Sequence, residues 1–318
     1  MDEIVAAGHL FTAVPGFTAI FMVTAALLIE LKPFPANGWA LDVYQATESG
    51  AVSVIAVVNS GAILYALLKI MPALPAAALT GLLWVGILTF FFSNFIGLRQ
   101  SSVKRLLGYS SAAQMGLILA AVTLALRDGM NQDFVIYTAG VLFVNHLLAK
   151  AGLFWLTSAQ RRPQWSRWRG PAGFAGFLIF GVLIFSLAGL PPFPAFWAKW
   201  RLVTSIIGTA PWIVALILGG SLCEAVYLLR WFGRSAALRR ASAGAAAEPA
   251  SAGAASAAGA AGTAGKGAAA ELPDPFPPRV ALPASIAALL LAAGGLVLAL
   301  PSGAAGYLVY SPLAAGTA

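Results

Sequence analysis

The sequence predicts an all-α membrane protein, a polytopic helix bundle with about eight transmembrane segments, one of which is a discontinuous helix. Hydrophobic residues make up 60% of the 318 residues and charged residues only 9%, and the mean hydropathy is +0.85. A soluble domain carries about 25% charged residues, so this composition excludes an ordinary soluble protein. The apolar residues also gather in runs of the ~20 residues that a helix needs to cross a bilayer.

We expect these runs at residues 10–30, 50–70, 76–98, 109–126, 134–157, 171–208, 211–232 and 281–300. The run 171–208 is too long for one ordinary span, and Gly189, Pro191, Pro192 and Pro194 interrupt it. Proline lacks a backbone N–H and clashes with the preceding helical turn. We therefore expect two half-helices separated by a break.

Basic residues between the runs predict the orientation of the chain. If the segment 171–208 crosses once, the alternate loops on one side hold only Lys69 and Arg127. The loops on the other side hold Lys32, Arg99, Lys104, Arg105, Arg161, Arg162, Arg167, Arg169, Arg230, Arg234, Arg239, Arg240, Lys266 and Arg279. The positive-inside rule places the richer side in the cytoplasm of a bacterial-type inner membrane, with both termini outside. If residues 171–208 formed a hairpin of two crossings, the basic residues from Arg230 to Arg279 would lie outside the cell, so we reject the hairpin.

Composition divides the chain into three parts. Residues 1–234 are expected to form a transmembrane domain, 235–279 an Ala/Gly-rich cytoplasmic linker, and 280–318 a C-terminal transmembrane helix and tail. Alanine-rich stretches permit helix, but the scattered glycines of the linker favour a flexible tether. One cysteine and two histidines predict no disulfide framework, metal site or cofactor. The net charge of +8 follows membrane topology, so we expect a lipid bilayer and no nucleic acid as partner.

His146 and Lys150 lie four residues apart in FVNHLLAKAGLFW, so both side chains face the same side of one helix. Each is costly in lipid unless it points into the bundle. Imidazole titrates near neutrality, and together the two side chains could pass protons between hydrated groups. The alternative is purely structural, with each side chain hydrogen-bonded to a neighbouring helix.

Lys199 and Glu224 are the other ionisable residues expected within later spans. Lys199 follows the proline-rich break, and free backbone polar groups at membrane depth require surrounding protein or water, so this is a candidate ion path. Alternatively, Lys199 extends its ammonium to the headgroups. Glu224 is a counter-ion for a lysine, a proton carrier, or a hydrogen-bonding partner of a neighbouring helix. The residues Ser110, Ser111 and Gln114 could line a water path or join helices.

Four stretches, in order, resemble the antiporter-like membrane subunits of respiratory complex I. They are PFPANGWALDVYQA, LRQSSVKRLLGYSSAAQMG, NHLLAKAGLFW and SLAGLPPFPAFWAKW, and together they extend from Pro33 to Lys199. The lysine on the broken helix is similar to that of the quinone-proximal subunit. Related proteins serve membrane-bound hydrogenases and multisubunit cation/proton antiporters.

The resemblance implies the second half of a fold of about fourteen helices with two inverted repeats. It implies that Lys150 and His146 occupy the central and connecting proton-relay positions, and Lys199 the terminal one. Lysines expected near Leu28 and near Ser60 are missing, so a partner chain is expected to complete the path at the first two helices. Glu30 and Lys32 are candidate substitutes, but the pattern places both near the cytoplasmic end.

The resulting hypothesis is a membrane subunit of an NADH-quinone oxidoreductase-like or hydrogenase complex that forms part of a proton-translocation path. Its partners would be other membrane subunits, which would carry the redox and quinone chemistry. Two alternatives stay open: a cation/proton antiporter subunit without redox coupling, and a structural subunit that does not pump.

Overall fold

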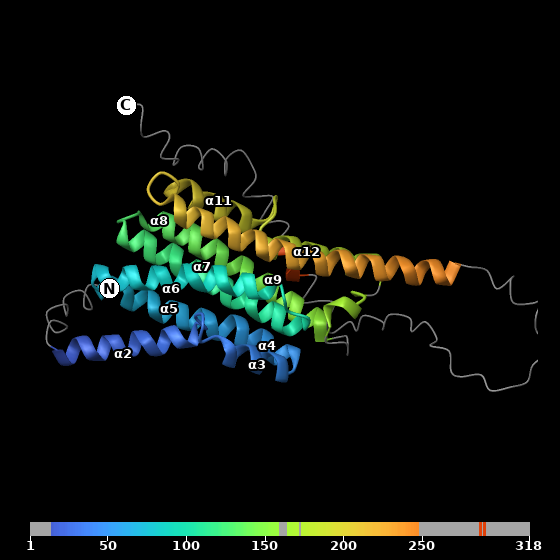
Figure 1. Cartoon of the computed structure of the whole chain (residues 1–318), viewed down its shortest axis with the longest axis horizontal. Coiled ribbons are helices and arrows are strands. Elements are labelled where there is room, and N and C mark those ends of the chain that lie inside the picture. Colours follow the sequence, from blue (N-terminus) through green and yellow to red (C-terminus); the bar gives the residue numbers. More distant parts are fainter. Residues whose placement is uncertain (1–13, 159–163, 172, 248–285, 288, 291–318) are drawn as a thin grey trace, which may run out of the picture.

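The computed structural model describes residues 14–158, 164–171, 173–247, 286–287 and 289–290 (Figure 1). All regular elements in this part of the chain are helical, apart from one isolated antiparallel bridge between Ser102 and Gln164. The α-helices are α2 (Val14–Glu30), α3 (Gly38–Ala46), α4 (Ser49–Val54), α5 (Ser60–Ile70), α6 (Ala76–Gly97), α7 (Val103–Arg127), α8 (Gln132–Val135), α9 (Val141–Ser158), α10 (Gly173–Ala188), α11 (Pro194–Ile206) and α12 (Pro211–Ala247). Short π-helical segments, η2 (Ile55–Asn59) and η4 (Ile136–Gly140), join α4 to α5 and α8 to α9.

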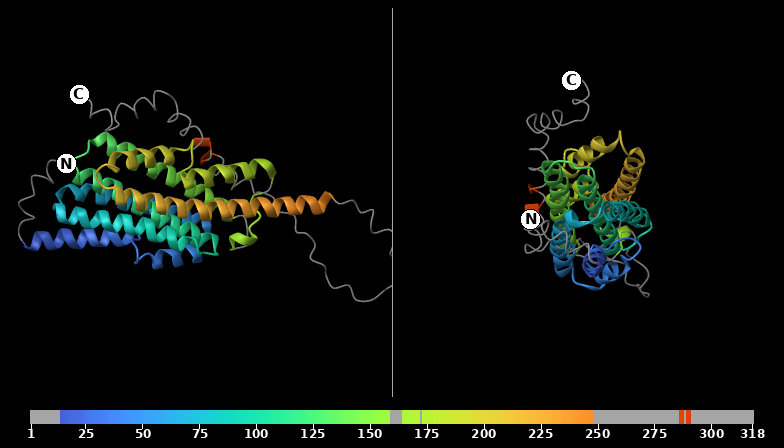
Figure 2. Two further views of the ribbon diagram at one scale, coloured as in Figure 1. Left: turned by 45° about the horizontal axis from the view of Figure 1, so that its top comes forward. Right: turned by 90° about the vertical axis from the view of Figure 1, so that its left-hand side faces the viewer.

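The helices lie side by side in a bundle, which confirms the predicted all-α membrane fold, whereas the count of eight segments stays a prediction (Figures 1 and 2). Within the described residues, four helical stretches are long and apolar enough to cross a bilayer: Ala76–Gly97, Val103–Arg127, Asp133–Thr157 and Pro211–Ser242. The last predicted segment, 281–300, falls mostly outside the described residues, as do both termini.

Helix α7 lies at the centre of the bundle, and every residue from Leu106 to Ala125 is buried. It packs closely against α6 where Gly86 meets Gly116. A Cβ atom built on either glycine would lie 2.7 Å from the carbonyl oxygen of the other. Because α7 is surrounded by other helices, its polar side chains face protein and not lipid.

The predicted break in the segment 171–208 is confirmed. Helix α10 ends at Ala188 and α11 begins at Pro194. Gly189, between them, has a φ of +72°, a left-handed conformation that side-chain-bearing residues rarely adopt. The break therefore follows from one glycine and three prolines that cannot continue α10.

A second discontinuous crossing, formed by α2 and α3, was not predicted. The backbone N–H of Phe34 donates to Thr89 Oγ1 at 3.0 Å, and Asn37 Nδ2 donates to Ser93 Oγ at 3.1 Å. Both acceptors lie in the second half of α6, and Lys32, directly before Pro33, donates to Ser60 midway along the crossing from Ser49 to Ile70, so this break lies inside the bundle. The expectation that Lys32 belongs to a cytoplasmic loop is therefore wrong. Pro33 and Pro35, directly after the apolar run, were the signal.

Helix α12 continues past residue 234, where composition places the start of the linker, to Ala247. Its 37 residues correspond to about 55 Å, well beyond the ~30 Å hydrocarbon core of a bilayer. Figures 1 and 2 show its last turns extending beyond the other helices. Ser235 donates to the carbonyl of Trp168, and the Arg239 guanidinium lies 4.8 Å from the centre of the Phe177 ring. These contacts hold the extension against the loop before α10 and against the start of α10 itself.

Candidate functional site: a buried polar row on α7

All four predicted site residues are buried inside the bundle. His146, Lys150 and Glu224 have no exposed surface, and Lys199 is 7% exposed. They come from α9, α11 and α12, and their polar atoms converge on α7. We call the set formed by His146, Lys150, Lys199 and Glu224 with Ser110, Ser111 and Gln114 of α7 the buried polar row.

Lys199 and Glu224 form an ion pair, with Lys199 Nζ 3.3 Å from Glu224 Oε2. Ser110 Oγ donates to Glu224 Oε1 at 2.8 Å, and Gln114 Nε2 donates to Oε2 at 2.6 Å. Three donors thus serve one carboxylate, which offsets part of the cost of burying its charge. The Lys199 ammonium points into the bundle, 5.8 Å from the centre of the Phe90 ring, and not toward the headgroups.

His146 and Lys150 lie on one face of α9, as their spacing predicts. Lys150 Nζ donates to the Leu107 carbonyl at 2.6 Å, and His146 Nε2 lies 3.4 Å from Ser111 Oγ. Among the described residues, His146 Nδ1 has no hydrogen-bond partner. A buried polar atom of this kind is usually served by an ordered water. The hydrogen bond from Lys150 to the Leu107 carbonyl would suit a structural role, but His146 keeps Nδ1 available to bind a proton.

The partners on α7 follow one stripe of the helix. Leu107, Ser111 and Gln114 are separated by four and three residues, and Ser110 lies beside them, so they share a face. The stripe brings the lysine and histidine of α9 together with the ion pair of α11 and α12. Glu224 also lies within electrostatic range of Lys150.

Lys32 is a buried cation that sequence reasoning placed elsewhere. It is 1% exposed, and its Nζ donates to Ser60 Oγ at 2.6 Å. The ammonium also lies 5.4 Å from the centre of the Tyr44 ring. Its φ of 63° is left-handed, which costs a residue with a side chain about 1–2 kcal/mol. The ammonium therefore lies at Ser60, near which the family resemblance implied a lysine that this chain lacks.

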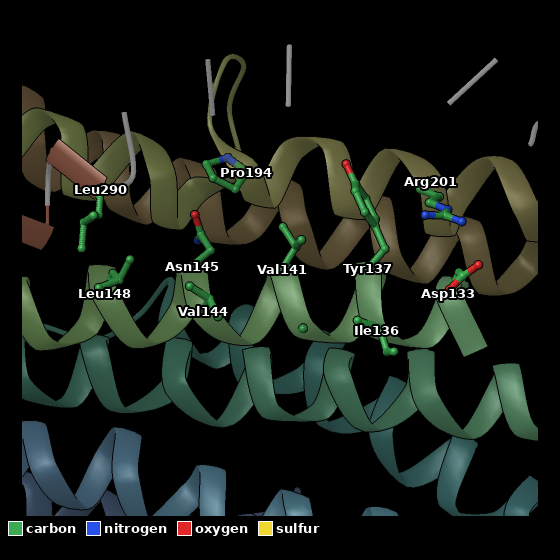
Figure 3. Close-up of a pocket in the computed structure, with 11 residues that line it drawn as sticks. Asp133, Ile136, Tyr137, Val141, Val144, Asn145, Leu148, Pro194, Arg201 and Leu290 are labelled. Atoms are coloured by element: carbon green, nitrogen blue, oxygen red, sulfur yellow. The ribbon is translucent and has the colours of Figure 1, made fainter. Parts of the chain in front are cut away.

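A separate groove of about 640 Å³ runs between the outer face of α9 and α11 (Figure 3). Its lining is mostly apolar, with Leu148 and Leu290 toward one end and Asp133, Tyr137 and Arg201 toward the other. None of the predicted site residues lines this groove. Its Asn145 is hydrogen-bonded to Ser186 at the end of α10, so it braces the half-helix.

The described residues contain no group of three or more His, Cys, Asp or Glu side chains that could hold a metal ion. The ionisable groups of the buried polar row are instead lysine, histidine and a paired carboxylate. These groups can bind and release protons.

Comparison with known proteins places this geometry in context. The model of a family described as "NADH:quinone oxidoreductase/Mrp antiporter, TM" matches residues 2–223. NADH-quinone oxidoreductase subunit N of Desulforudis audaxviator is 29% identical over 230 residues, covering 67% of this chain and 44% of the relative. The subunit N of a Sulfurovum species is 29% identical over 238 residues, covering 70% and 46%. The chain therefore spans less than half the length of these relatives.

Solved structures share the fold. A chain of respiratory complex I from Thermus thermophilus superposes with a TM-score of 0.65 at 25% identity, covering 89% of this chain and 57% of that one. A chain of an archaeal membrane-bound sulfane sulfur reductase gives 0.69 at 22% identity, covering 91% and 56%. A chain of the Mrp complex from a Dietzia species gives 0.69 at 19% identity, covering 89% and 57%.

Proposed function

Because the chain belongs to the NADH:quinone oxidoreductase/Mrp antiporter transmembrane family, we propose that it is a membrane subunit of a complex I-like oxidoreductase. In this proposal it carries part of a proton path through His146, Lys150, Glu224 and Lys199. The supporting observation is the buried polar row, in which four ionisable side chains from three helices share one stripe of α7. Ionisable residues at membrane depth are costly and mark ion pathways.

The geometry suggests how each group takes part. Lys199 and Glu224 are in direct contact at 3.3 Å, so a proton can pass from the ammonium to the carboxylate without an intermediary. Ser110 and Gln114 hold the carboxylate oxygens in place during that transfer. His146 can accept a proton at Nδ1. Water would have to bridge the remaining steps, because the structure shows no direct contact between Lys150 and the ion pair.

The proposal assigns the redox chemistry to partner subunits of the same membrane complex. The relatives are named as subunits of NADH-quinone oxidoreductases, and the solved neighbours come from multi-subunit membrane complexes. We further propose that both termini lie outside and that the linker is cytoplasmic, following the distribution of basic residues. The three-part division at residues 234 and 279 belongs to the same proposal.

The test uses the chain purified with its partner subunits and reconstituted in vesicles. A membrane potential is imposed, and internal pH is followed with a trapped dye. Lys199→Ala and Lys150→Leu should each slow the proton flux by at least about tenfold, as the loss of a proton-transfer group does. Lys69→Ala, which removes a lysine beside Tyr65 at the far end of α5, is the control.

Two results would contradict the proposal. If both variants assemble and pass protons at the wild-type rate, the chain is a structural subunit. Proton movement that occurs only when sodium or potassium moves in the opposite direction, lost in Lys199→Ala, would instead identify a cation/proton antiporter subunit.

A further inference from the structure

We propose that Lys32 is a further proton-carrying residue, which extends the buried polar row to the break between α2 and α3. This inference rests on the proposed function of the row. It adds Lys32, which the sequence pattern had placed near the cytoplasmic end and which the structure buries against Ser60.

The first support is the position of the ammonium. Ser60, its hydrogen-bond partner, lies midway along the crossing formed by α4, η2 and α5. The break that carries Lys32 is fixed to the second half of α6 through Thr89 and Ser93. The ammonium therefore lies well inside the bundle, away from both ends of the crossing that contains Ser60.

The second support is the lack of a counter-ion in contact. Among the described residues, Lys32 makes one hydrogen bond to a neutral hydroxyl and one contact with an aromatic ring. Glu30, two residues earlier, lies within electrostatic range but forms no ion pair with it. A charged group at this depth is costly without such a pair, and a methionine would fill the same space without that cost. A structural role does not account for this arrangement, whereas a group that gains and loses a proton does.

The third support is a link from Lys32 to His146. The ring of Tyr44 touches the ammonium, and its hydroxyl lies toward Ser111 without a direct hydrogen bond. Ser111 is also the neighbour of His146. Both the Tyr44 hydroxyl and His146 Nδ1 are buried and lack partners within the described part of the chain. His146 lies within electrostatic range of Lys32 and of Lys150.

The inferred step moves one proton and no electrons. The Lys32 ammonium gives a proton through water and the Tyr44 hydroxyl to the imidazole of His146. Lys32 is left as the neutral amine, and His146 becomes the imidazolium. His146 then passes the proton toward Lys150, and Lys32 is free to take up the next one.

The experiment uses the same complex, reconstituted with its partner subunits, and the same pH readout. Lys32→Gln keeps a hydrogen-bond donor for Ser60 but cannot carry a proton, and it should slow the flux by at least about tenfold. The double variant Lys32→Met/Ser60→Lys supplies an ammonium to the same place from α5. It should restore most of the flux that Lys32→Met alone removes.

Lys69→Met, on the same helix as Ser60 but near its far end, is the matched control and should pass protons at the wild-type rate. Thermal unfolding of each variant verifies assembly. If Lys32→Gln passes protons normally while Lys199→Ala does not, this inference is overturned and the proposed function stands. If the double variant folds but does not restore the proton flux, Lys32 has only a structural role. If neither lysine matters, the proposed function itself has failed.

Discussion

At the scale of single residues, the pairing of Lys199 with Glu224 places two opposite charges inside the bundle. The two side chains are 9% and 0% exposed, and the carboxylate also accepts hydrogen bonds from Ser110 and Gln114. Removal of one member of a buried pair leaves an uncompensated charge, whereas removal of both leaves an apolar contact. The pair thus makes each partner depend on the other.

We expect Glu224→Leu to destabilise the protein by about 3–5 kcal/mol, because Lys199 is left charged and buried. The double variant Glu224→Leu/Lys199→Met should recover most of that loss. Unfolding of the purified complex in detergent, by heat or denaturant, measures both.

The control for this cycle is Asp42→Ala, which breaks the exposed pair between Asp42 and Arg105 at 2.8 Å. An exposed pair contributes only about 0–1 kcal/mol, so this variant should be nearly neutral. A Glu224→Leu protein as stable as Asp42→Ala would show that the buried contact is not a charged pair.

At the scale of elements, small residues set how closely the helices pack and where they break. The contact between α6 and α7 depends on Gly86 and Gly116, and the break after α10 depends on the left-handed φ of Gly189. Each position tolerates only hydrogen in place of a side chain. Substitution of a glycine that has no close neighbours serves as the control, because it adds the same methyl group without a clash.

Gly86→Ala should lower stability by about 1–3 kcal/mol, because its Cβ would lie 2.7 Å from the carbonyl oxygen of Gly116 on the facing helix. Gly81→Ala is the control on the same helix, since nothing lies within 4 Å of its Cβ position. Thermal unfolding of the two variants provides the comparison. Equal stability would mean that α6 and α7 can separate without cost.

Gly189→Ala should impair proton movement as well as stability. Its Cβ would lie 3.2 Å from Lys199 Nζ and would displace the ammonium from Glu224. Gly129→Ala has a similar left-handed φ of 63° but open space around it, so it reproduces only the backbone strain of about 1–2 kcal/mol. Equal proton flux in the two variants would contradict the displacement.

At the scale of the whole molecule, the alternation of crossings decides which loops share a side. The loop after α9 and the end of α12 lie together, because Ser235 and Arg234 bond to carbonyls of Trp168 and Ser166. Lys104, in the first turn of α7, donates to the carbonyl of Thr47 at the same end. Although Lys32 lies inside the bundle and not in a loop, the same loops still share a side, because α2 and α3 together make one crossing.

Single cysteines in a Cys223→Ser background test the proposed orientation in intact cells. Arg167→Cys and Ser256→Cys should resist a membrane-impermeant thiol reagent, because the basic side is expected in the cytoplasm. Gly208→Cys, in the exposed turn between α11 and α12, should be labelled. The reverse pattern would invert the topology.

The sequence by itself determined the helical class, the break at Gly189 to Pro194 and the shared face of His146 and Lys150. These follow from local rules: apolar length, the missing N–H of proline and the 3.6-residue period of a helix. The apolar composition also predicts that a lipid bilayer surrounds the helices.

Only the tertiary structure decided which polar groups meet. Glu224 bonds to Ser110 and Gln114, which lie 114 and 110 residues away along the chain, and Lys32 bonds to Ser60 across 28 residues. The depth of Lys32 depends on Thr89 and Ser93, which hold the break against the second half of α6. A linear pattern gives each helix a periodic face, but packing against other helices decides what that face touches and how deep it lies.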